Sequence, residues 1–173
     1  MQNAQYPIGK LNFQQTYWPE EISGMTTIMA EYPAKYEAIS QHLSEADLAA
    51  QYREGSFTVR QIFHHLADMQ FLNFMRFKIA LTEDAPTAPV VNIDAWTTTA
   101  DNAAPIEDSV ILLKHTHNRW VMLLKSLDEE QWNRTYFHPV RKVTLDLRAA
   151  LHLSSWHIQH HYEHLEIALG KKG

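Results

Sequence analysis

The 173-residue chain contains no cysteine, and this absence limits its chemistry at once. Disulfides and thiolate metal ligands are excluded, so any metal site must be built from histidine, aspartate or glutamate side chains. Chemistry that needs a thiol would have to take that thiol from another molecule. The sequence therefore directs attention to its eleven histidines.

Positive charge and long apolar runs are also scarce. The formal net charge is −5 and the basic residues are scattered, which argues against nucleic acid and anionic membranes as partners. No apolar run approaches the roughly 20 residues of a membrane span. The polar start MQNAQYPIGK lacks the features of a signal peptide. We therefore expect a cytoplasmic protein that acts on a small-molecule substrate.

Glycine is rare and alternating β-branched patterns are scarce, so helices should dominate. Apolar residues recur at helical spacing in four long segments. We expect helices over residues 20–42, 58–81, 105–127 and 144–169. This pattern predicts an all-α four-helix bundle that forms a single domain over residues 1–173.

Several residues mark where these helices begin, end or break. Residues 58–61 read Thr-Val-Arg-Gln, the pattern of a capping box. Pro105 suits the first position of a helix and Gly170 suits the residue after its end. Pro33 should kink or divide the first helix.

The connections between the predicted helices are long. Residues 82–104 and 128–143 leave room for a crossover and for loops that roof a site at one end of the bundle. Only residues 135–145, TYFHPVRKVTL, could form a strand pair or an ordered loop. Any site would therefore lie between helices under these connections.

The stretch WHIQHHYEH, residues 156–164, is dense in histidine. It offers two pairs one helical turn apart, His157 with His161 and His160 with His164. At about 100° per residue, His161 lies nearest the aliphatic face of the helix and His157 next. A second apolar patch of the same helix lies beyond His160, so His160 and His164 remain an alternative pair of ligands.

A third ligand should come from another helix, and FHHLAD offers two candidates. His65 lies at the rim of the apolar face, whereas His64 points about 100° away, toward solvent or a flanking helix. Three histidines with an open coordination position are typical of a catalytic metal site. Zinc is the expected metal, with nickel, manganese or iron as alternatives.

Other residues near these histidines have several possible roles. Asp68 and Glu163 could accept the second ring N–H of a ligand, although each is more often a surface charge. His138 and His164 could add a fourth ligand or act as acid or base, as could Glu163. The plainer alternatives are loop structure for His138 and a supporting position behind the ligands for His164. We expect His160 and Asp68 to lie next to the metal ligands without binding the metal themselves.

Several sequence blocks together resemble the DinB/YfiT-like family. They are YPIGK, YREGSFTVRQIFHHLAD, RFKIALTEDAPT, HNRWVMLL, TYFHP and WHIQHHYEH, and the resemblance extends over most of the chain. The resemblance implies a cytoplasmic four-helix bundle with a three-histidine metal site, commonly a homodimer. The family's ligands correspond to His65, His157 and His161.

The resemblance implies a metal-dependent hydrolase that activates water. The alternative is a metal-dependent S-transferase that joins a low-molecular-weight thiol, such as bacillithiol, to an electrophile. A second alternative is a metal-binding bundle without enzyme activity. Arg53, Arg60 or Arg141 could hold a carboxylated or phosphorylated cofactor, although such residues are ordinarily solvated surface charges.

Overall fold

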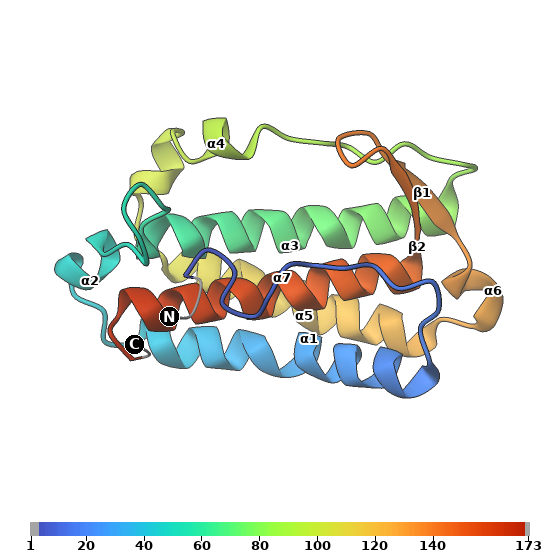
Figure 1. Ribbon diagram of the computed structural model, residues 1–173, viewed down its shortest axis with the longest axis horizontal. Helices are drawn as coiled ribbons and strands as arrows, with labels where there is room; N and C mark the ends of the chain where they lie inside the picture. The colour runs from blue at the N-terminus through green and yellow to red at the C-terminus, as the bar shows by residue number, and fades with distance from the viewer. Residues whose placement is uncertain (1–3, 172–173) are drawn as a thin grey trace.

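Residues 4–171 are described by a computed structural model, in which four long helices form a bundle (Figure 1). These helices are α1 (Pro19–Ser40), α3 (Val59–Thr82), α5 (Glu107–Ser126) and α7 (Leu147–Ala168). The shorter elements are α2 (Glu45–Ala49), α4 (Ile93–Trp96), η1 (Ala100–Ala103), α6 (Glu129–Trp132), β1 (Thr135–His138) and β2 (Val143–Asp146). The predicted four-helix bundle is confirmed. The predicted domain also includes residues 1–3 and 172–173, which lie outside the described part.

The helix boundaries follow from local hydrogen bonds. The Thr58 hydroxyl accepts from the Gln61 backbone N–H at 3.2 Å, and Gln61 Oε1 accepts from the Thr58 N–H at 3.0 Å. The predicted capping box is therefore confirmed. Gly170, with φ +66°, ends α7 as predicted. The prediction for Pro105 is wrong, because α5 begins two residues later, at Glu107.

The first helix is not divided at Pro33, which lies within α1. Proline has no N–H to donate to the carbonyl four residues earlier, which here belongs to Met29. His117 of α5 supplies a replacement, since its Nδ1 lies 2.7 Å from the Met29 oxygen. A buried histidine of a neighbouring helix thus bonds the carbonyl that the proline leaves free.

Residues 135–146 form the strand pair that the sequence allowed. Strand β1 pairs antiparallel with β2, in a register that sets Thr135 opposite Asp146 and His138 opposite Val143. Asp146 then caps α7 by accepting from the Ala149 N–H at 2.8 Å. The helix therefore begins at 147 and not at the predicted 144, because the preceding residues belong to the strand.

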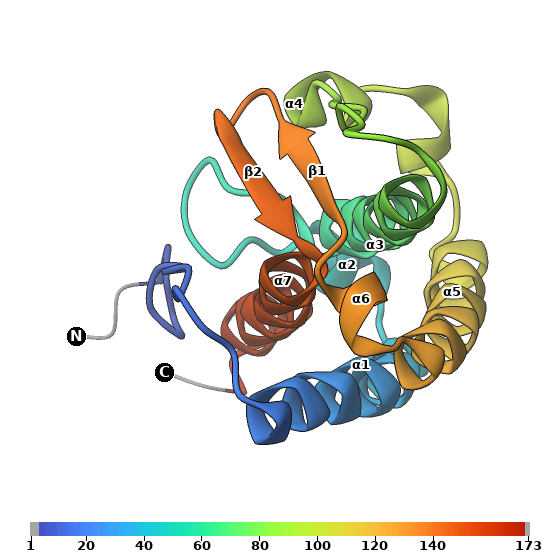
Figure 2. The same ribbon diagram turned by 90° about the vertical axis from the view of Figure 1, so that its right-hand side faces the viewer.

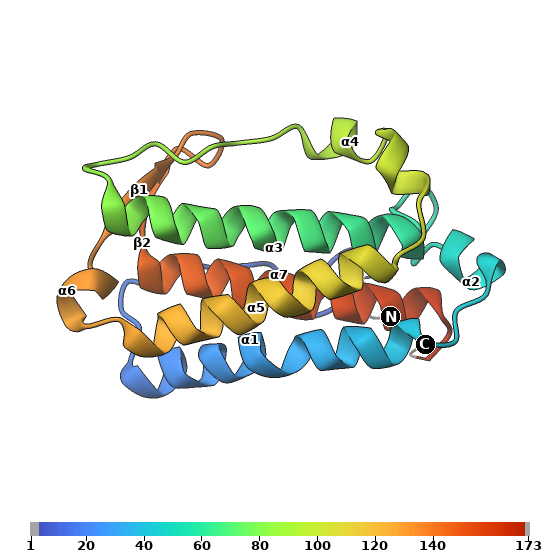
Figure 3. The same ribbon diagram turned by 180° about the vertical axis from the view of Figure 1, so that it is seen from behind.

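The order of the helices around the bundle is not their order in the chain. Helix α1 packs against α5 and α7, and α3 packs against the same two. Helices α3 and α5 run in the same direction, so the chain must return along the bundle between them (Figures 1 and 3). Residues 83–106 make this return, which is the predicted crossover.

Three segments cover the side of α3 and α7 that faces away from α1 and α5 (Figure 2). They are the crossover, the β1–β2 hairpin and the chain before α1. The crossover joins the hairpin through the Ala88 N–H, 2.8 Å from the Phe137 oxygen, and the Phe137 N–H, 2.9 Å from the Pro86 oxygen. Trp156 Nε1 donates to the Gly9 oxygen at 3.2 Å. The predicted roof thus runs along the side of the bundle and not over one end.

The interior of the bundle is filled by large apolar side chains. The largest fully buried ones include Trp120, Tyr36, Phe63, Phe77, Leu113 and Leu151. Within residues 4–171, no helix is both long enough and apolar enough to cross a membrane.

Candidate metal centre

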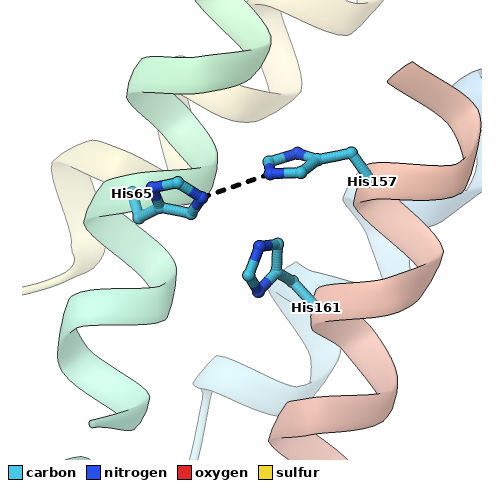
Figure 4. A group of neighbouring side chains, drawn as sticks. All are labelled: His65, His157 and His161. Atoms are coloured by element: carbon cyan, nitrogen blue, oxygen red, sulfur yellow. Dashed lines mark hydrogen bonds between the residues drawn. The ribbon is translucent and has the colours of Figure 1, made fainter. Parts of the chain in front are cut away.

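Three histidines from two helices converge between α3 and α7 (Figure 4). His65 comes from α3, whereas His157 and His161 lie one turn apart on α7. One nitrogen atom of each ring lies within 4.8 Å of the other two. The structure therefore brings together the three residues that the sequence proposed as metal ligands.

The separation of two of these nitrogens fits a shared ion. Nε2 of His65 and Nε2 of His157 lie 3.2 Å apart. Two nitrogens on one tetrahedral zinc, with bonds of about 2.0–2.1 Å, are separated by about 3.3 Å. The pair is therefore spaced like two ligands of one ion.

All three imidazoles are neutral at pH 7. Burial lowers the pKa of His65 to about 4. Burial, followed by repulsion from neighbouring positive groups, holds the pKa values of His157 and His161 well below 6.5. Neutral imidazole is the form that binds metals, because it keeps a free lone pair on one nitrogen. The donor set is thus suited to a divalent ion.

A buried glutamine supports His157 from behind. The fully buried Gln70 donates through Nε2 to the Ser154 carbonyl at 3.1 Å, and this nitrogen lies 3.4 Å from His157 Nδ1. Its other amide atom, Oε1, is buried and has no hydrogen-bond partner among residues 4–171. A histidine that ligates through Nε2 carries its proton on Nδ1 and needs an acceptor there. Gln70 Nε2 can only donate, so Nδ1 of His157 accepts in this structure, and a proton on Nδ1 would require the amide to turn and give up its bond to the Ser154 carbonyl.

A second histidine supports His161. Nδ1 of His164 lies 3.4 Å from Nδ1 of His161, which leaves Nε2 of His161 to face the other two rings. The ring of His164 stacks on Tyr52 with centroids 3.7 Å apart. Burial lowers the pKa of His164 to about 4, so it is neutral and can accept a hydrogen bond. His164 therefore lies behind a proposed ligand.

The other residues predicted near the ligands lie to the side. His160 stacks on Trp156 at 4.2 Å, and its nearest approach to a proposed ligand is a ring contact with His161. Asp68 lines a small hollow beside His65, where burial and the nearby Asp101 raise its carboxyl pKa. Within residues 4–171, no hydrogen bond joins Asp68 or His160 to the three histidines.

Two further candidates interact with residues outside the cluster. The charge of Glu163 acts on Tyr36, which donates its hydroxyl to the Ile158 carbonyl at 2.8 Å. His64 is buried against α5, with Nδ1 2.8 Å from Ser109 Oγ. The flanking-helix alternative for His64 is therefore the one that the structure adopts.

An open cavity of about 380 Å³ begins at His157 and extends along α3. Its lining residues are Met69, Asn73, Arg76, Val90, Val91, Ile93, His138, Val140, Arg141, Leu153 and His157. Among the predicted acid or base residues, His138 faces this cavity. Its Nδ1 accepts from the Arg141 backbone N–H at 3.4 Å, and burial together with two arginines lowers its pKa.

The candidate cofactor-binding arginines have different surroundings. Arg60 pairs with Glu45 at 2.6 Å, and Arg53 lies over the ring of Tyr52. Arg141 is exposed on the turn of the hairpin and lines the cavity. Of the three, only Arg141 has the cavity beside it.

The sequence interpretation missed three polar residues of α3. Gln70, Asn73 and Arg76 are buried at intervals of three residues, so they follow the same side of the helix. The available signal was this spacing, since polar side chains that recur within an apolar helical face need partners. This polar spacing was overlooked because aliphatic residues dominate the helical pattern of α3.

The chain belongs to the DinB superfamily. Residues 30–165 match this family. YfiT of Bacillus subtilis strain 168, named a "putative metal-dependent hydrolase", is 35% identical over 94% of this chain and 92% of its own length. A protein of Bacillus pumilus with the same description is also 35% identical, over 95% of this chain and 94% of its own length.

Solved structures agree with the fold. The structure of Bacillus subtilis YfiT, described as having "an unusual four-helix bundle topology", matches with a TM-score of 0.90 and 32% identity. The match covers 97% of this chain and 95% of that chain. A mycothiol-dependent maleylpyruvate isomerase matches with a TM-score of 0.64 and 14% identity, over 83% of this chain and 60% of that chain. This second likeness concerns the fold alone.

Proposed function

We propose that the protein is a metal-dependent hydrolase whose divalent ion is held by His65, His157 and His161. The observation that carries this proposal is the convergence of three neutral imidazoles, two of them buried and that of His157 half-buried, next to an open cavity. Zinc is the metal expected for such ligands, and nickel, manganese and iron are compatible with them. The names of the Bacillus relatives support the same activity.

A divalent ion supplies Lewis-acid chemistry at such a site, since it polarises a carbonyl and lowers the pKa of water. The residues of the chain orient the ligands, limit the access of solvent and donate a hydrogen bond. Gln70 and His164 fix the orientation of two rings, and the crossover and hairpin limit the access of solvent. His138 accepts at Nδ1, so its neutral form carries the proton on Nε2 and can donate to a substrate oxygen in the cavity.

Thiol transfer is the second candidate, and the lining of the cavity favours it. No aspartate or glutamate lines the cavity, so an obvious carboxylate base for hydrolysis is missing there. A thiol on a divalent ion loses its proton without a separate base. The chain has no cysteine, so this thiol would come from a small molecule such as bacillithiol.

One set of assays separates the candidates. Protein loaded with zinc, manganese or nickel is incubated with ester and amide panels, and separately with thiols plus monochlorobimane. Metal-dependent hydrolysis without conjugation supports the first candidate, and conjugation without hydrolysis replaces it with the second. A metal-loaded protein that is inactive in both assays supports a non-enzymatic metal-binding bundle.

A matched variant controls for contaminating enzymes. The double variant His157→Ala/His161→Ala, purified in the same way, should lack activity in whichever assay is positive. Activity that survives in this variant would show that the three histidines are not the active site.

A further inference from the structure

The cavity beside His157 contains a buried positive charge without a carboxylate. Arg76 is only 3% exposed, and its hydrogen-bond partners are neutral. Nε and Nη2 donate to the Pro89 carbonyl at 3.1 and 2.6 Å, and Nη1 donates to Asn73 Oδ1 at 2.8 Å. These bonds leave two of the five guanidinium N–H groups.

Other arginines of the protein do pair with carboxylates. Arg60, Arg134 and Arg148 form salt bridges with Glu45, Asp84 and Glu129, respectively. Within residues 4–171, no salt bridge involves Arg76. Because a buried charge is normally paired, Arg76 is suited to an anionic partner from outside the chain.

A second guanidinium faces the same cavity. Arg141 lies at its exposed edge on the hairpin turn, and it too lacks a salt bridge within the described residues. The two arginines are close enough to disfavour each other's charge and that of His138. No acidic residue of the lining offsets them. An anion between them would relieve this repulsion.

The other residues that line the cavity indicate what the ligand is like beyond its anionic group. Apolar side chains predominate, including Met69, Val90, Ile93 and Leu153. The lining extends along α3 from Met69 to Arg76, a rise of about 10 Å at 1.5 Å per residue. The cavity therefore suits an elongated molecule with an apolar body and a charged end.

We propose that the cavity binds an elongated carboxylate substrate, with the carboxylate at Arg76 and Arg141 and the apolar body directed toward His157. The planar guanidinium forms paired hydrogen bonds with a carboxylate, which suits this end group. The inference rests on the proposed function, because it places the reacting bond of the substrate near the three histidines. It defines the substrate class of either candidate reaction.

The test compares two probes of the same shape and different charge. The zinc-loaded protein is titrated calorimetrically with 2-naphthoate and with the neutral 2-naphthamide. We expect naphthoate to bind more tightly by about tenfold, the size expected for one charged hydrogen bond. Arg141→Gln should remove this preference by weakening naphthoate alone, and Arg141→Lys should retain part of it.

Arg119→Gln is the matched control. Arg119 is exposed on α5 and lies over the ring of Phe74, much as Arg141 lies over that of Phe13. This control should bind both probes like the unchanged protein. Equal binding of the two probes, or no naphthoate binding at millimolar concentrations, would overturn the proposal. An unchanged naphthoate affinity in Arg141→Gln, or an equal loss in Arg119→Gln, would overturn it as well.

Metal-stripped protein separates this inference from the proposed function. A carboxylate can also bind the metal directly, so the same titrations are repeated after chelation. We expect the Arg141-dependent preference to persist, and a preference that disappears with the metal would assign the anion to the ion. Elemental analysis of each variant measures its metal content separately from the titrations. A failure of the carboxylate proposal can therefore be distinguished from a failure of the proposed metal site.

Discussion

Nε2 of His65 and Nε2 of His157 lie 3.2 Å apart, although 92 positions separate the two residues in the chain. The unusual order of the helices makes this possible, because it sets α3 directly against α7. The His65 ring also contacts His161, with centroids 4.8 Å apart. The packing of these two helices is therefore what assembles the site.

Removal of two proposed ligands should abolish metal binding. We expect His157→Ala/His161→Ala to contain no stoichiometric metal by elemental analysis after purification, because a single imidazole cannot retain the ion. His160→Ala is the matched control, since His160 lies on the same helix and stacks on Trp156. Full metal content in the double variant would show that the ion binds elsewhere.

Gln70→Leu should weaken metal binding without unfolding the protein. The change removes the amide beside His157 Nδ1, and the loss of such a partner typically costs about 10- to 100-fold in metal affinity. The measurement is a competition titration with a chelator. Gln159→Leu is the control, because Gln159 also donates to a carbonyl of α7, that of Ser155, but lies away from the cluster. Equal affinities of the two variants would exclude the supporting role of Gln70.

His164→Phe tests the support of His161. Phenylalanine keeps a ring against Tyr52 and removes the nitrogen 3.4 Å from His161 Nδ1. We expect a metal affinity lower by about tenfold, with a thermal stability of the metal-free protein close to that of the unchanged chain. If His164 instead acted as acid or base in the reaction, the rate would fall while the metal affinity stayed constant.

The metal-free protein should lose stability in acid, partly through His117. Burial lowers the pKa of His117 from 6.5 to about 4. The unfolded chain therefore takes up this proton at a higher pH than the folded protein. The stabilisation is complete above pH 6.5 and is lost as the pH falls from 6.5 to about 4, by at most about 3 kcal/mol.

Urea unfolding across this pH range measures the effect. His117→Gln keeps an amide donor for the Met29 carbonyl but does not titrate, so its stability should fall less steeply with pH. His115→Gln is the control, because His115 is exposed on the same helix. Parallel pH profiles for His117→Gln and the unchanged protein would contradict the prediction.

The sequence determined the class of fold and the chemistry of the donor set. Apolar residues at helical spacing fix which segments form helices, and the pattern around Thr58 fixes where one of them begins. The absence of cysteine leaves imidazole and carboxylate as ligands. The helical angles of His65, His157 and His161 favoured them over their neighbours and left the pair His160 and His164 open, because side-chain direction along a helix is a local property.

The tertiary structure decided everything that depends on contacts between distant segments. Pro33 was expected to kink or divide α1, and the helix stays undivided, with its free carbonyl bonded by His117. Gln70 and Arg76 are unremarkable residues in the sequence, yet helix packing buries one behind His157 and the other in the cavity. These relationships arise from which helices are neighbours and how the crossover returns, and helical periodicity carries no information about either.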